Sequence, residues 1–346
     1  MKNNKIFVIA EAGSNWKSNN KINDLKRAKK LIELASKLGA DAVKFQTYRA
    51  ESVYVENSGK SNYLKKSGLN QNIFEIFKKH SMPYDMIPKL ANYCKTKKIM
   101  FMSTPFSVDD AKQLNPYVKI HKIASFEINH IRLLEYLAST KKPIILSTGA
   151  STYQEIDFAI KLLKKNKSGR ITIMHTISKY PAPSLSLNLR AITELKNKYD
   201  LPIGFSDHSL NPSFAPLLAI GLGATIIEKH FTLNKKFKGP DHNFALNPSE
   251  LKKMINAIRE SEIMLGVERK FVNNYEKELQ NFAKRSIQAI TKISVGEKLV
   301  ENENFSILRP GNNKRGAEPR FLNKVKGKKA KRNIKKGDGI HLIDCL

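Results

Sequence analysis

An alternation of short apolar segments with amphipathic ones runs through the first 265 residues and constrains the fold more than any other feature. The apolar segments have the length of strands, and the segments between them show the 3.6-residue periodicity of helices. Eight strand–helix pairs are predicted, with strands at 6–11, 42–47, 99–103, 118–124, 143–147, 171–176, 201–208 and 224–230. Alternating pairs form parallel sheets, and eight of them at this length predict a closed (β/α)8 barrel.

An open, doubly wound sheet is the competing architecture for this pattern. Such sheets commonly carry a glycine-rich phosphate loop directly after the first strand. That position holds AEAGS (residues 10–14), which does not match GxGxxG. The predicted fold class is therefore α/β, with a TIM barrel.

The pattern changes after residue 265. Residues 266–283 are polar and irregular, which predicts a linker, and residues 284–346 predict a small, mostly β domain. Within this domain, ISVG (293–296) and IKKG (334–337) resemble each other, and each reads as the end of a strand followed by a turn. A domain of this size buries little surface by itself, so we expect it to pack against something, such as a partner subunit.

The net charge of +30 raises the question of nucleic-acid binding. Of the 61 basic residues 49 are lysines, and they are spread along helix faces, with one dense run at 324–336. A solvated basic surface, which also attracts anionic substrates, explains this distribution better than a nucleic-acid site. We expect no nucleic-acid partner.

No apolar run approaches the roughly 18 residues of a membrane span. The N-terminus enters a strand pattern without the apolar core of a signal peptide. Cys94 and Cys345 have no disulfide or metal spacing. A soluble, cytoplasmic protein without a membrane partner is expected.

Polar side chains end nearly every predicted strand. In barrels of this type the carboxyl ends of the strands carry the active site. Lysines and small hydroxyls at one mouth suit phosphate and carboxylate groups, so a polyanionic, polyhydroxylated substrate is expected. The strand-end residues are Glu11, Lys44, Gln46, Thr104, Lys122, Ser125, Glu127, Ser147, Thr148, His175, Ser178, Tyr180, Ser206, His208, Glu228 and His230.

Two of these strands, LPIGFSDH (201–208) and ATIIEKH (224–230), end in histidine. Alternate residues of a strand share a face, so Ser206 points with His208 and Glu228 with His230. Parallel neighbouring strands would bring the two imidazoles together as metal ligands; the other interpretation is two unrelated histidines. Such a site fits Mn, Zn, Co or Fe. The chemistry predicted from the residues alone is that of a metal-assisted lyase, aldolase or transferase acting on a phosphorylated acid.

A series of short motifs, in order along the chain, resembles the sialic acid synthase family. The barrel motifs are IAEAG (9–13), GADAVKFQTY (39–48), STPF (103–106), KIASFE (122–127), ILSTG (145–149), YPAP (180–183), GFSDHS (204–209), EKHFTL (228–233) and GPDH (239–242). RSI (285–287), LRPG (308–311) and GKKA (327–330) resemble that family's antifreeze-like (SAF) domain. The resemblance covers essentially the whole chain.

The resemblance implies a reaction in which phosphoenolpyruvate condenses with an open-chain N-acetylated amino sugar. The products would be a nine-carbon 2-keto acid and inorganic phosphate, formed by C–O bond cleavage. A divalent metal, Mn²⁺ first, with Mg²⁺, Co²⁺ or Zn²⁺ as alternatives, would hold the sugar aldehyde. The family also implies a domain-swapped homodimer in which the SAF domain caps the partner's barrel.

Roles for single residues follow from the same resemblance. His208 and His230 would bind the metal, Glu127 would transfer protons, and Glu11 would lie beside the metal. Arg309 of LRPG would reach the N-acyl group of the sugar in the partner's barrel. The residues implied around phosphoenolpyruvate are Lys44, Lys122, Ser125, Ser147, Ser178 and Ser206. Those implied for the sugar pocket are Gln46, Thr104, Phe106, Tyr180 and Asp241.

For several positions a purely structural role is the alternative to a functional one. Glu228 and His175 could be packed or paired rather than functional, and Phe106 and Tyr180 could be packing residues. Trp16–Lys17–Ser18 departs from the Asn-His-Asn-Gly usual in the family, and residues 312–317 form a longer loop than usual. Both departures bear on sugar recognition.

The acceptor sugar stays open. KIASFE and SDHS resemble pseudaminic acid synthases, whereas GPDH and EKHFTL resemble sialic and legionaminic acid synthases. N-acetylmannosamine and a deoxy-diacetamido sugar are the two acceptors considered. Two other classes remain: a synthase using a phosphorylated aldose, and a non-catalytic polyanion-binding protein.

Overall fold

The computed structural model describes residues 5–18, 20–61 and 70–346. The chain divides into two compact units, with the boundary between Gly266 and Val267. Each unit has a hydrophobic core of its own.

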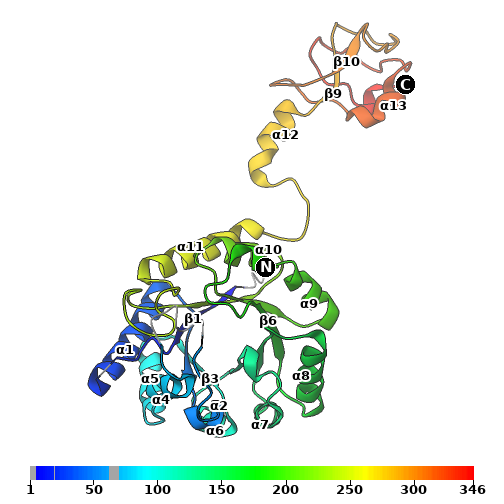
Figure 1. Ribbon diagram of the computed structural model, residues 1–346. Helices are drawn as coiled ribbons and strands as arrows, with labels where there is room; N and C mark the ends of the chain where they lie inside the picture. The colour runs from blue at the N-terminus through cyan, green and yellow to red at the C-terminus, as the bar shows by residue number, and fades with distance from the viewer. Residues whose placement is uncertain (1–4, 19, 62–69) are drawn as a thin grey trace. The chain divides into compact units, whose positions relative to one another are not determined.

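Eight parallel strands form the centre of the first unit (Figure 1). They pair in the order β3-β2-β1-β8-β7-β6-β5-β4, and β3 and β4 at the two ends of this order are also in contact. The sheet therefore curls into a nearly closed barrel, which confirms the predicted fold class. The strands are β1 (Phe7–Gly13), β2 (Ala42–Thr47), β3 (Met100–Pro105), β4 (His121–Ile123), β5 (Ile144–Ser147), β6 (Ile171–Thr176), β7 (Ile203–Asp207) and β8 (Ile226–His230).

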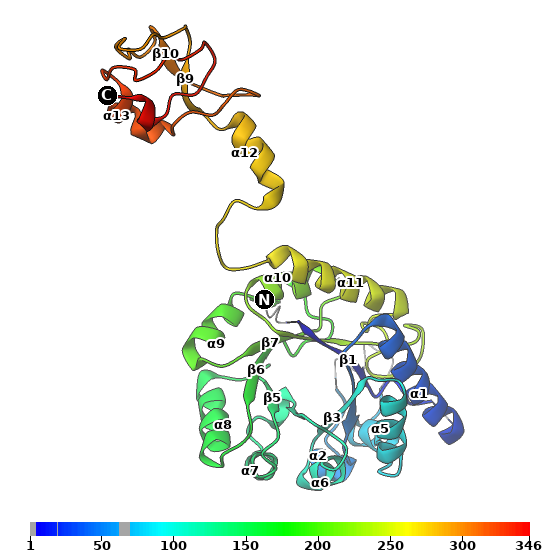
Figure 2. The ribbon, with the colours of Figure 1, turned by 180° about the vertical axis from the view of Figure 1, so that it is seen from behind.

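Helices surround the strands on the outside of the barrel, as Figures 1 and 2 show from opposite sides. Buried apolar residues on each helix cover the outward-facing side chains of the strands. The helices after the strands are α1 (Lys21–Leu38), α5 (Met86–Thr96), α6 (Val108–Leu114), α7 (Ile131–Ser139), α8 (Tyr153–Lys165), α9 (Ala191–Tyr199), α10 (Phe214–Gly221) and α11 (Pro248–Leu265). Two short helices, α2 (Ala50–Val53) and α4 (Ile73–His80), lie between β2 and α5.

Several strands are shorter than predicted, and local chemistry explains the differences. Val118, expected to open the fourth strand, donates its N–H to the carbonyl of Leu114 and so extends the preceding helical turn. Pro202 precedes β7 and has no N–H to donate to a ladder. His208 lies one residue beyond β7, where the chain turns away from the sheet.

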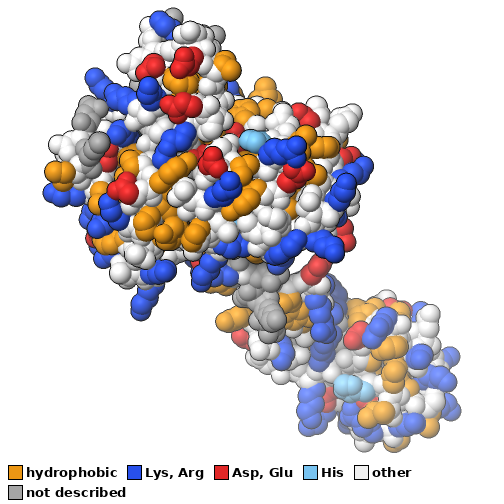
Figure 3. Space-filling view, turned by 90° about the horizontal axis from the view of Figure 1, so that it is seen from below, with side chains coloured by type: hydrophobic (Ala, Val, Ile, Leu, Met, Phe, Trp, Pro, Cys, Tyr) orange, Lys and Arg blue, Asp and Glu red, His pale blue; other side chains and the backbone are white. Residues whose placement is uncertain are grey.

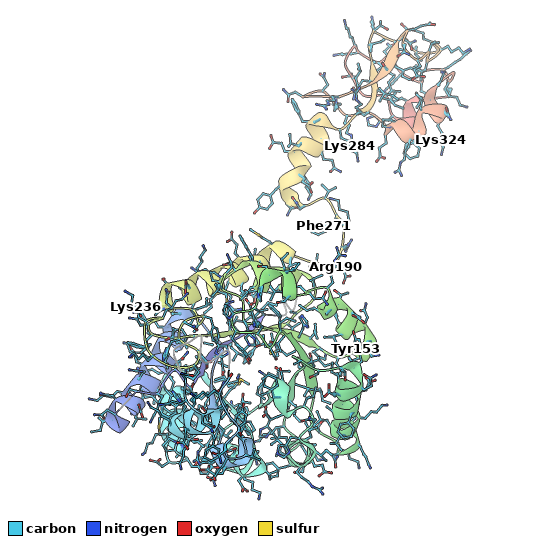
Figure 4. All side chains as sticks on the ribbon, in the orientation of Figure 1. Tyr153, Arg190, Lys236, Phe271, Lys284 and Lys324 are labelled. Carbon is cyan, nitrogen blue, oxygen red and sulfur yellow. The ribbon has the colours of Figure 1, made fainter. Side chains whose placement is uncertain are left out.

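The inside of the barrel is layered. An apolar layer of Ile9, Ala42, Met102, Ile145 and Met174 fills its middle. The next inward-facing residues toward the carboxyl ends are charged or hydroxylic, because side chains two residues apart along a strand share a face. The apolar layer therefore forms the floor of any site at the carboxyl ends. On the outside, Tyr153, Arg190 and Lys236 lie at the periphery of the helical ring (Figure 4).

The second unit contains helix α12 (Lys277–Ala283), an antiparallel pair β9 (Ser286–Ala289) and β10 (Phe305–Leu308), and the short helix α13 (Leu322–Val325). The expectation that 266–283 is wholly irregular is therefore wrong for α12. The two repeated turns are paired: Ile293 and Ile334 exchange backbone hydrogen bonds of 2.9 Å. Gly296 and Gly337 both adopt the left-handed conformation, with φ of 82° and 89°.

Lysine and arginine side chains are scattered among acidic and apolar ones on the face shown in Figure 3. In the described part of the chain, no helix combines the length and apolar character needed to cross a membrane.

Candidate active site

Two adjoining cavities open at the carboxyl ends of the barrel strands. The inner chamber has a volume of about 70 Å³ and is lined by Glu11, Lys44, Gln46, Thr104, Phe106, Lys122, Ala124, Ser125, Ser147, Thr176, Tyr180, Ser206, His208, Glu228 and His230. The outer cavity, of about 560 Å³, shares six of these residues: Gln46, Phe106, Ala124, Ser125, Tyr180 and His230. The inner chamber is thus a small, charged pocket beneath a larger one.

Two buried lysines share one carboxylate inside the inner chamber. Lys122 Nζ donates to Glu228 Oε1 and Oε2 at 2.8 and 3.0 Å, and Lys44 Nζ lies 3.6 Å from Glu228 Oε1. Lys44 also pairs with Glu11 Oε2 at 2.6 Å and donates to Thr104 at 3.0 Å. Burying a charged group costs free energy unless the charge is paired. The four paired groups here lie on four different strands, β1, β2, β4 and β8.

Burial and pairing set the protonation states of these groups. Burial would raise the pKa of Glu228, but Lys122 and Lys44 lower it to about 2. Burial also raises the pKa of Glu11, and although Lys44 opposes this effect, the pKa reaches about 7. Burial lowers the pKa of Lys122. Burial acts in the same direction on Lys44, but Glu11 and Glu228 outweigh it and raise the pKa of Lys44. The inner chamber therefore holds two buried lysines beside one carboxylate, that of Glu228, which stays ionised at neutral pH.

The hydroxyl groups of Ser125 and Ser178 lie close to Gly149. The backbone N–H of Gly149 donates to Ser125 Oγ at 3.0 Å. A side chain at position 149 would collide with the hydroxyl of Ser178 and lie 2.9 Å from that of Ser125. Only glycine therefore lets the backbone approach these two serines. Ser178 Oγ is buried without a hydrogen-bond partner among the described residues, so it is free to bind a ligand oxygen.

The two histidines lie side by side at the junction of the cavities, with ring centroids 5.5 Å apart. The parallel pairing of β7 with β8 brings them together, as predicted. His208 Nδ1 donates to the Ile177 carbonyl at 2.7 Å, which leaves Nε2 unprotonated. Burial lowers the pKa of His208 to about 4 and also lowers that of His230, so both rings are neutral at pH 7.

These residues fit a divalent metal held by two imidazoles. His230 Nδ1 is a buried nitrogen without a hydrogen-bond partner among the described residues, and His208 offers its free Nε2. No cluster of three or more His, Cys, Asp or Glu suited to a metal exists in the described part of the chain. A metal here would keep several coordination positions for water or substrate oxygens.

The outer cavity has one polar and one apolar side. Its polar side includes Gln46, Ser178, Glu127 and Asp241, and burial raises the pKa of each of these carboxyls to about 7. Asp241 Oδ2 lies 3.6 Å from His230 Nδ1. Its apolar lining includes Val53, Tyr54, Ile73, Ile76, Phe77 and Phe106, which we call the apolar wall. A ligand that fills this cavity therefore needs both polar and apolar groups.

We predict that Glu127→Gln stabilises the fold increasingly as pH rises. The folded pKa of Glu127, about 7, exceeds its ordinary value of 4.5, so the folded protein binds more protons between these values. The free energy of unfolding of the wild type therefore falls from pH 4.5 to 7. The variant should gain about 3 kcal/mol over the wild type at pH 8 and almost nothing at pH 4.5, measured by urea unfolding.

The control for this prediction is Glu75→Gln, which changes an exposed carboxylate on α4. Glu75→Gln should change the free energy of unfolding by the same amount at pH 4.5 and at pH 8. If the stability difference between Glu127→Gln and the wild type is independent of pH, Glu127 does not have a raised pKa. A proton-transfer role for Glu127 also requires this stabilised variant to lose about 10²-fold or more in turnover.

All barrel residues to which the family resemblance assigns a role line one of the two cavities, whereas Thr148 and His175 of the predicted strand ends line neither. Arg309 lies exposed after β10 in the second unit, and its contact with a sugar stays a prediction. His175 lines neither cavity: its Nε2 bonds the Leu187 carbonyl at 2.8 Å and its ring stacks on Phe205, so it is a packed residue.

The unusual first loop points away from the cavities. Trp16 is 1% exposed and belongs to the hydrophobic core, and Lys17 pairs with Asp24 at 2.8 Å. Of this loop, Ser14 reaches the outer cavity. The departure at residues 16–18 therefore affects packing, and does not place these side chains against a ligand.

Three features of the site escaped sequence reasoning. The sequence does not decide between a functional and a structural role for Glu228, which in the structure is the shared partner of both lysines. Thr176 was not singled out, although its position at the end of β6 was a signal available in the sequence. Most of the apolar wall comes from α2, the residue after it and α4; the sequence predicts a short helix at about 73–79, but nothing local to it places that helix at the mouth of the barrel.

Comparison with known proteins places this geometry in context. A family model described as the NeuB family matches residues 31–270. The spore coat polysaccharide biosynthesis protein SpsE of Bacillus subtilis is 38% identical, with 99% of this chain and 94% of the relative covered. Its crystal structure superposes with a TM-score of 0.65 at 37% identity, covering 99% of this chain and 95% of that one.

Two further relatives come from Campylobacter jejuni. A pseudaminic acid synthase is 36% identical, covering 97% of this chain and 95% of its own. An N,N'-diacetyllegionaminic acid synthase is also 36% identical, covering 96% of this chain and 98% of its own. The similarity to these synthases therefore extends over both units of the chain.

Proposed function

The chain belongs to the NeuB family, and on this premise we propose that it is a nonulosonic (sialic-type) acid synthase. It would condense phosphoenolpyruvate with an N-acetylated amino sugar and release inorganic phosphate. One observation carries the proposal: a lysine-lined inner chamber adjoins a larger cavity, with His208 and His230 lining the inner chamber and His230 and Glu127, whose pKa is raised, lining the outer cavity.

Phosphoenolpyruvate suits the inner chamber by charge and by hydrogen bonding. Lys44 and Lys122 offer cationic donors to its phosphate and carboxylate, and Ser125, Ser147 and Ser206 add hydroxyl donors. Glu228 opposes the effect of burial on the pKa of both lysines. The free hydroxyl of Ser178 supports an additional contact at the mouth of the chamber.

The reaction joins carbon three of phosphoenolpyruvate to the aldehyde carbon of the sugar. Water then adds at carbon two, and the C–O bond to phosphate breaks to leave a keto group. The aldehyde oxygen gains one proton and the departing phosphate gains another, which balances the protons lost by the water and by the new hydroxyl at carbon two. Glu127 and Glu11, whose pKa values lie near 7, can both hold and release protons at neutral pH.

A divalent metal bound by His208 and His230 would polarise the sugar carbonyl when present, and Mn²⁺ fits these ligands. The protein's part is to keep both imidazoles neutral and to orient His208 through the Ile177 carbonyl. Tyr180, whose ring centroid lies 4.2 Å from that of His208, covers this side of the site.

The outer cavity favours the deoxy-diacetamido acceptor over N-acetylmannosamine. Hydroxyl groups against Val53, Ile73 and Phe77 would lose hydrogen bonds to water without replacement. A sugar methyl group and the methyl of a second acetamido group can instead pack on this wall. Lys179 and His230 are the basic side chains among the described residues lining the cavity, which disfavours a phosphorylated aldose.

Phosphate release by the purified protein tests the proposal. With phosphoenolpyruvate and Mn²⁺, we expect turnover with 2,4-diacetamido-2,4,6-trideoxyhexoses, weaker turnover with N-acetylmannosamine and none with arabinose 5-phosphate. Absence of phosphate with every amino sugar would refute the synthase. Salt-sensitive binding of nucleic acid without turnover would favour a polyanion-binding protein.

We also propose that the second unit acts as an SAF cap on the partner's barrel in a homodimer, with Arg309 reaching the sugar. Arg309→Ala should then raise KM for the sugar and leave KM for phosphoenolpyruvate unchanged. Mixed dimers of inactive His208→Ala and impaired Arg309→Ala should contain one intact composite site. Renatured mixtures should therefore exceed the activity of either variant alone, whereas no rescue would place the cap within one chain.

A further inference from the structure

A second buried charge network lies behind the two histidines, outside both cavities. Lys229 Nζ donates to Asp207 Oδ2 in a short ion pair and to the backbone carbonyl of Ser209 at 2.7 Å. Asp207 Oδ1 in turn accepts the backbone N–H of Ser209 at 2.8 Å. Lys229 and Asp207 are 2% and 1% exposed. We call these three residues the clamp.

The clamp connects the two strand ends that carry the histidines. Asp207 and Ser209 flank His208 in the chain, and Lys229 immediately precedes His230. Asp207 and Lys229 are direct register partners of β7 and β8, with side chains on the face opposite to Ser206 and Glu228. The ammonium group of Lys229, next to His230, therefore bonds the residue before His208 through the Asp207 carboxylate and the residue after it through the Ser209 carbonyl.

Other bonds complete the restraint on His208. Its ring is held by the Ile177 carbonyl, and its own carbonyl accepts the N–H of Ala182 at 2.9 Å. The clamp adds hydrogen bonds from the Lys229 side chain on β8 to the residues on either side of His208. The spacing of the two imidazoles consequently depends on Lys229.

Stability alone does not account for the clamp. A buried ion pair is commonly replaced by packed apolar residues with little or no loss of stability, because desolvation offsets the attraction. What apolar residues cannot reproduce is a directed bond from β8 to the backbone carbonyl at residue 209. The residues that orient metal ligands typically change metal affinity 10- to 100-fold when mutated.

We propose that Lys229, with Asp207 and Ser209, is a positioning clamp that sets the spacing and orientation of His208 and His230 for a divalent metal. The inference rests on the proposed function for the metal itself. None of the three clamp residues lines either cavity, so the clamp acts through the histidines and not on substrate.

The test compares the wild type with Lys229→Met/Asp207→Leu, which removes both charges and keeps apolar volume. Co²⁺ alone is titrated and followed by its visible absorption, and Mn²⁺ alone by electron paramagnetic resonance. We expect the variant to remain folded, to bind either ion about 10-fold or more weakly, and to show a changed Co²⁺ spectrum. A wild-type Kd and spectrum in the folded variant would overturn the clamp.

Two controls separate positioning from folding. Ser209→Ala removes only the longer contact of Lys229 Nζ with Ser209 Oγ at 3.5 Å and keeps the backbone carbonyl, so it should weaken metal binding far less than the double variant. Lys17→Met removes a partly buried ion pair remote from the histidines and should lower stability without changing metal affinity. If the double variant does not fold, Asp207→Asn is measured instead, with the same expected loss, and wild-type values there overturn the proposal.

Failure of the clamp and failure of the proposed function give different results. A wild type that turns over and binds Co²⁺, with variants that bind it equally well, rejects the clamp alone. A wild type that binds neither ion and releases no phosphate rejects the metal site and the synthase, and the clamp with them.

Discussion

His208→Ala should lose bound divalent metal and turnover together. The imidazole Nε2 is one of the two histidine nitrogens that the site offers to a metal, so its loss leaves His230 as the single imidazole ligand. Polarisation of the sugar carbonyl by a metal contributes several kcal/mol, so we expect turnover to fall by about 10³-fold or more. Metal content after gel filtration and phosphate release measure the two losses, and His230→Ala should behave in the same way.

His175→Gln is the matched control for this prediction. His175 is as buried as the other two histidines, but its Nε2 bonds the Leu187 carbonyl and it lines neither cavity. It should lose some stability and retain both metal and turnover at a temperature where the variant is folded. Full activity in His208→Ala would show that the pair of histidines is structural.

Glu228→Gln should produce the second large effect, on the binding of phosphoenolpyruvate and on stability. Lys122 and Lys44 lose the buried anion that lies 2.8 and 3.6 Å from their ammonium groups. Burial already lowers the pKa of Lys122, and the substitution lowers it further. We expect KM for phosphoenolpyruvate to rise about 10-fold or more, with a loss of about 3–5 kcal/mol in stability.

The pH dependence of Glu228→Gln identifies the cause. A lysine with a lowered folded pKa binds fewer protons in the folded than in the unfolded protein, so the free energy of unfolding rises with pH in that range. The difference in free energy of unfolding between the variant and the wild type should therefore become smaller between pH 7 and pH 10. Glu135→Gln, which breaks an exposed pair with Arg132, should cost less than about 1 kcal/mol. A constant deficit would mean that the lysines are not the origin of the loss.

Much of the candidate site could be predicted because strand geometry is local. Once β7 and β8 are parallel neighbours, the two-residue period of a strand decides that Ser206 and Glu228 face inward and that Asp207 and Lys229 face outward. Lys44 and Gln46 follow the same rule on β2. Neither inference needs a contact distance.

Pairing across the barrel could not be predicted in the same way. Lys122 and Glu228 are 106 residues apart in the chain and come from strands that are not neighbours in the sheet. Their contact depends on the barrel's diameter and on which rotamers fill it. For the same reason Glu228 was assigned no definite role until its neighbours were visible.

The sequence by itself determined the barrel and the identity of the residues at its mouth, because both follow from periodicity within short segments. The tertiary structure alone decided how those residues pair: the two lysines around Glu228, the clamp behind the histidines and the apolar wall from α2 and α4. The physical reason is that ion pairing and cavity shape depend on distances between segments far apart in the chain. Those distances exist only after the sheet has closed.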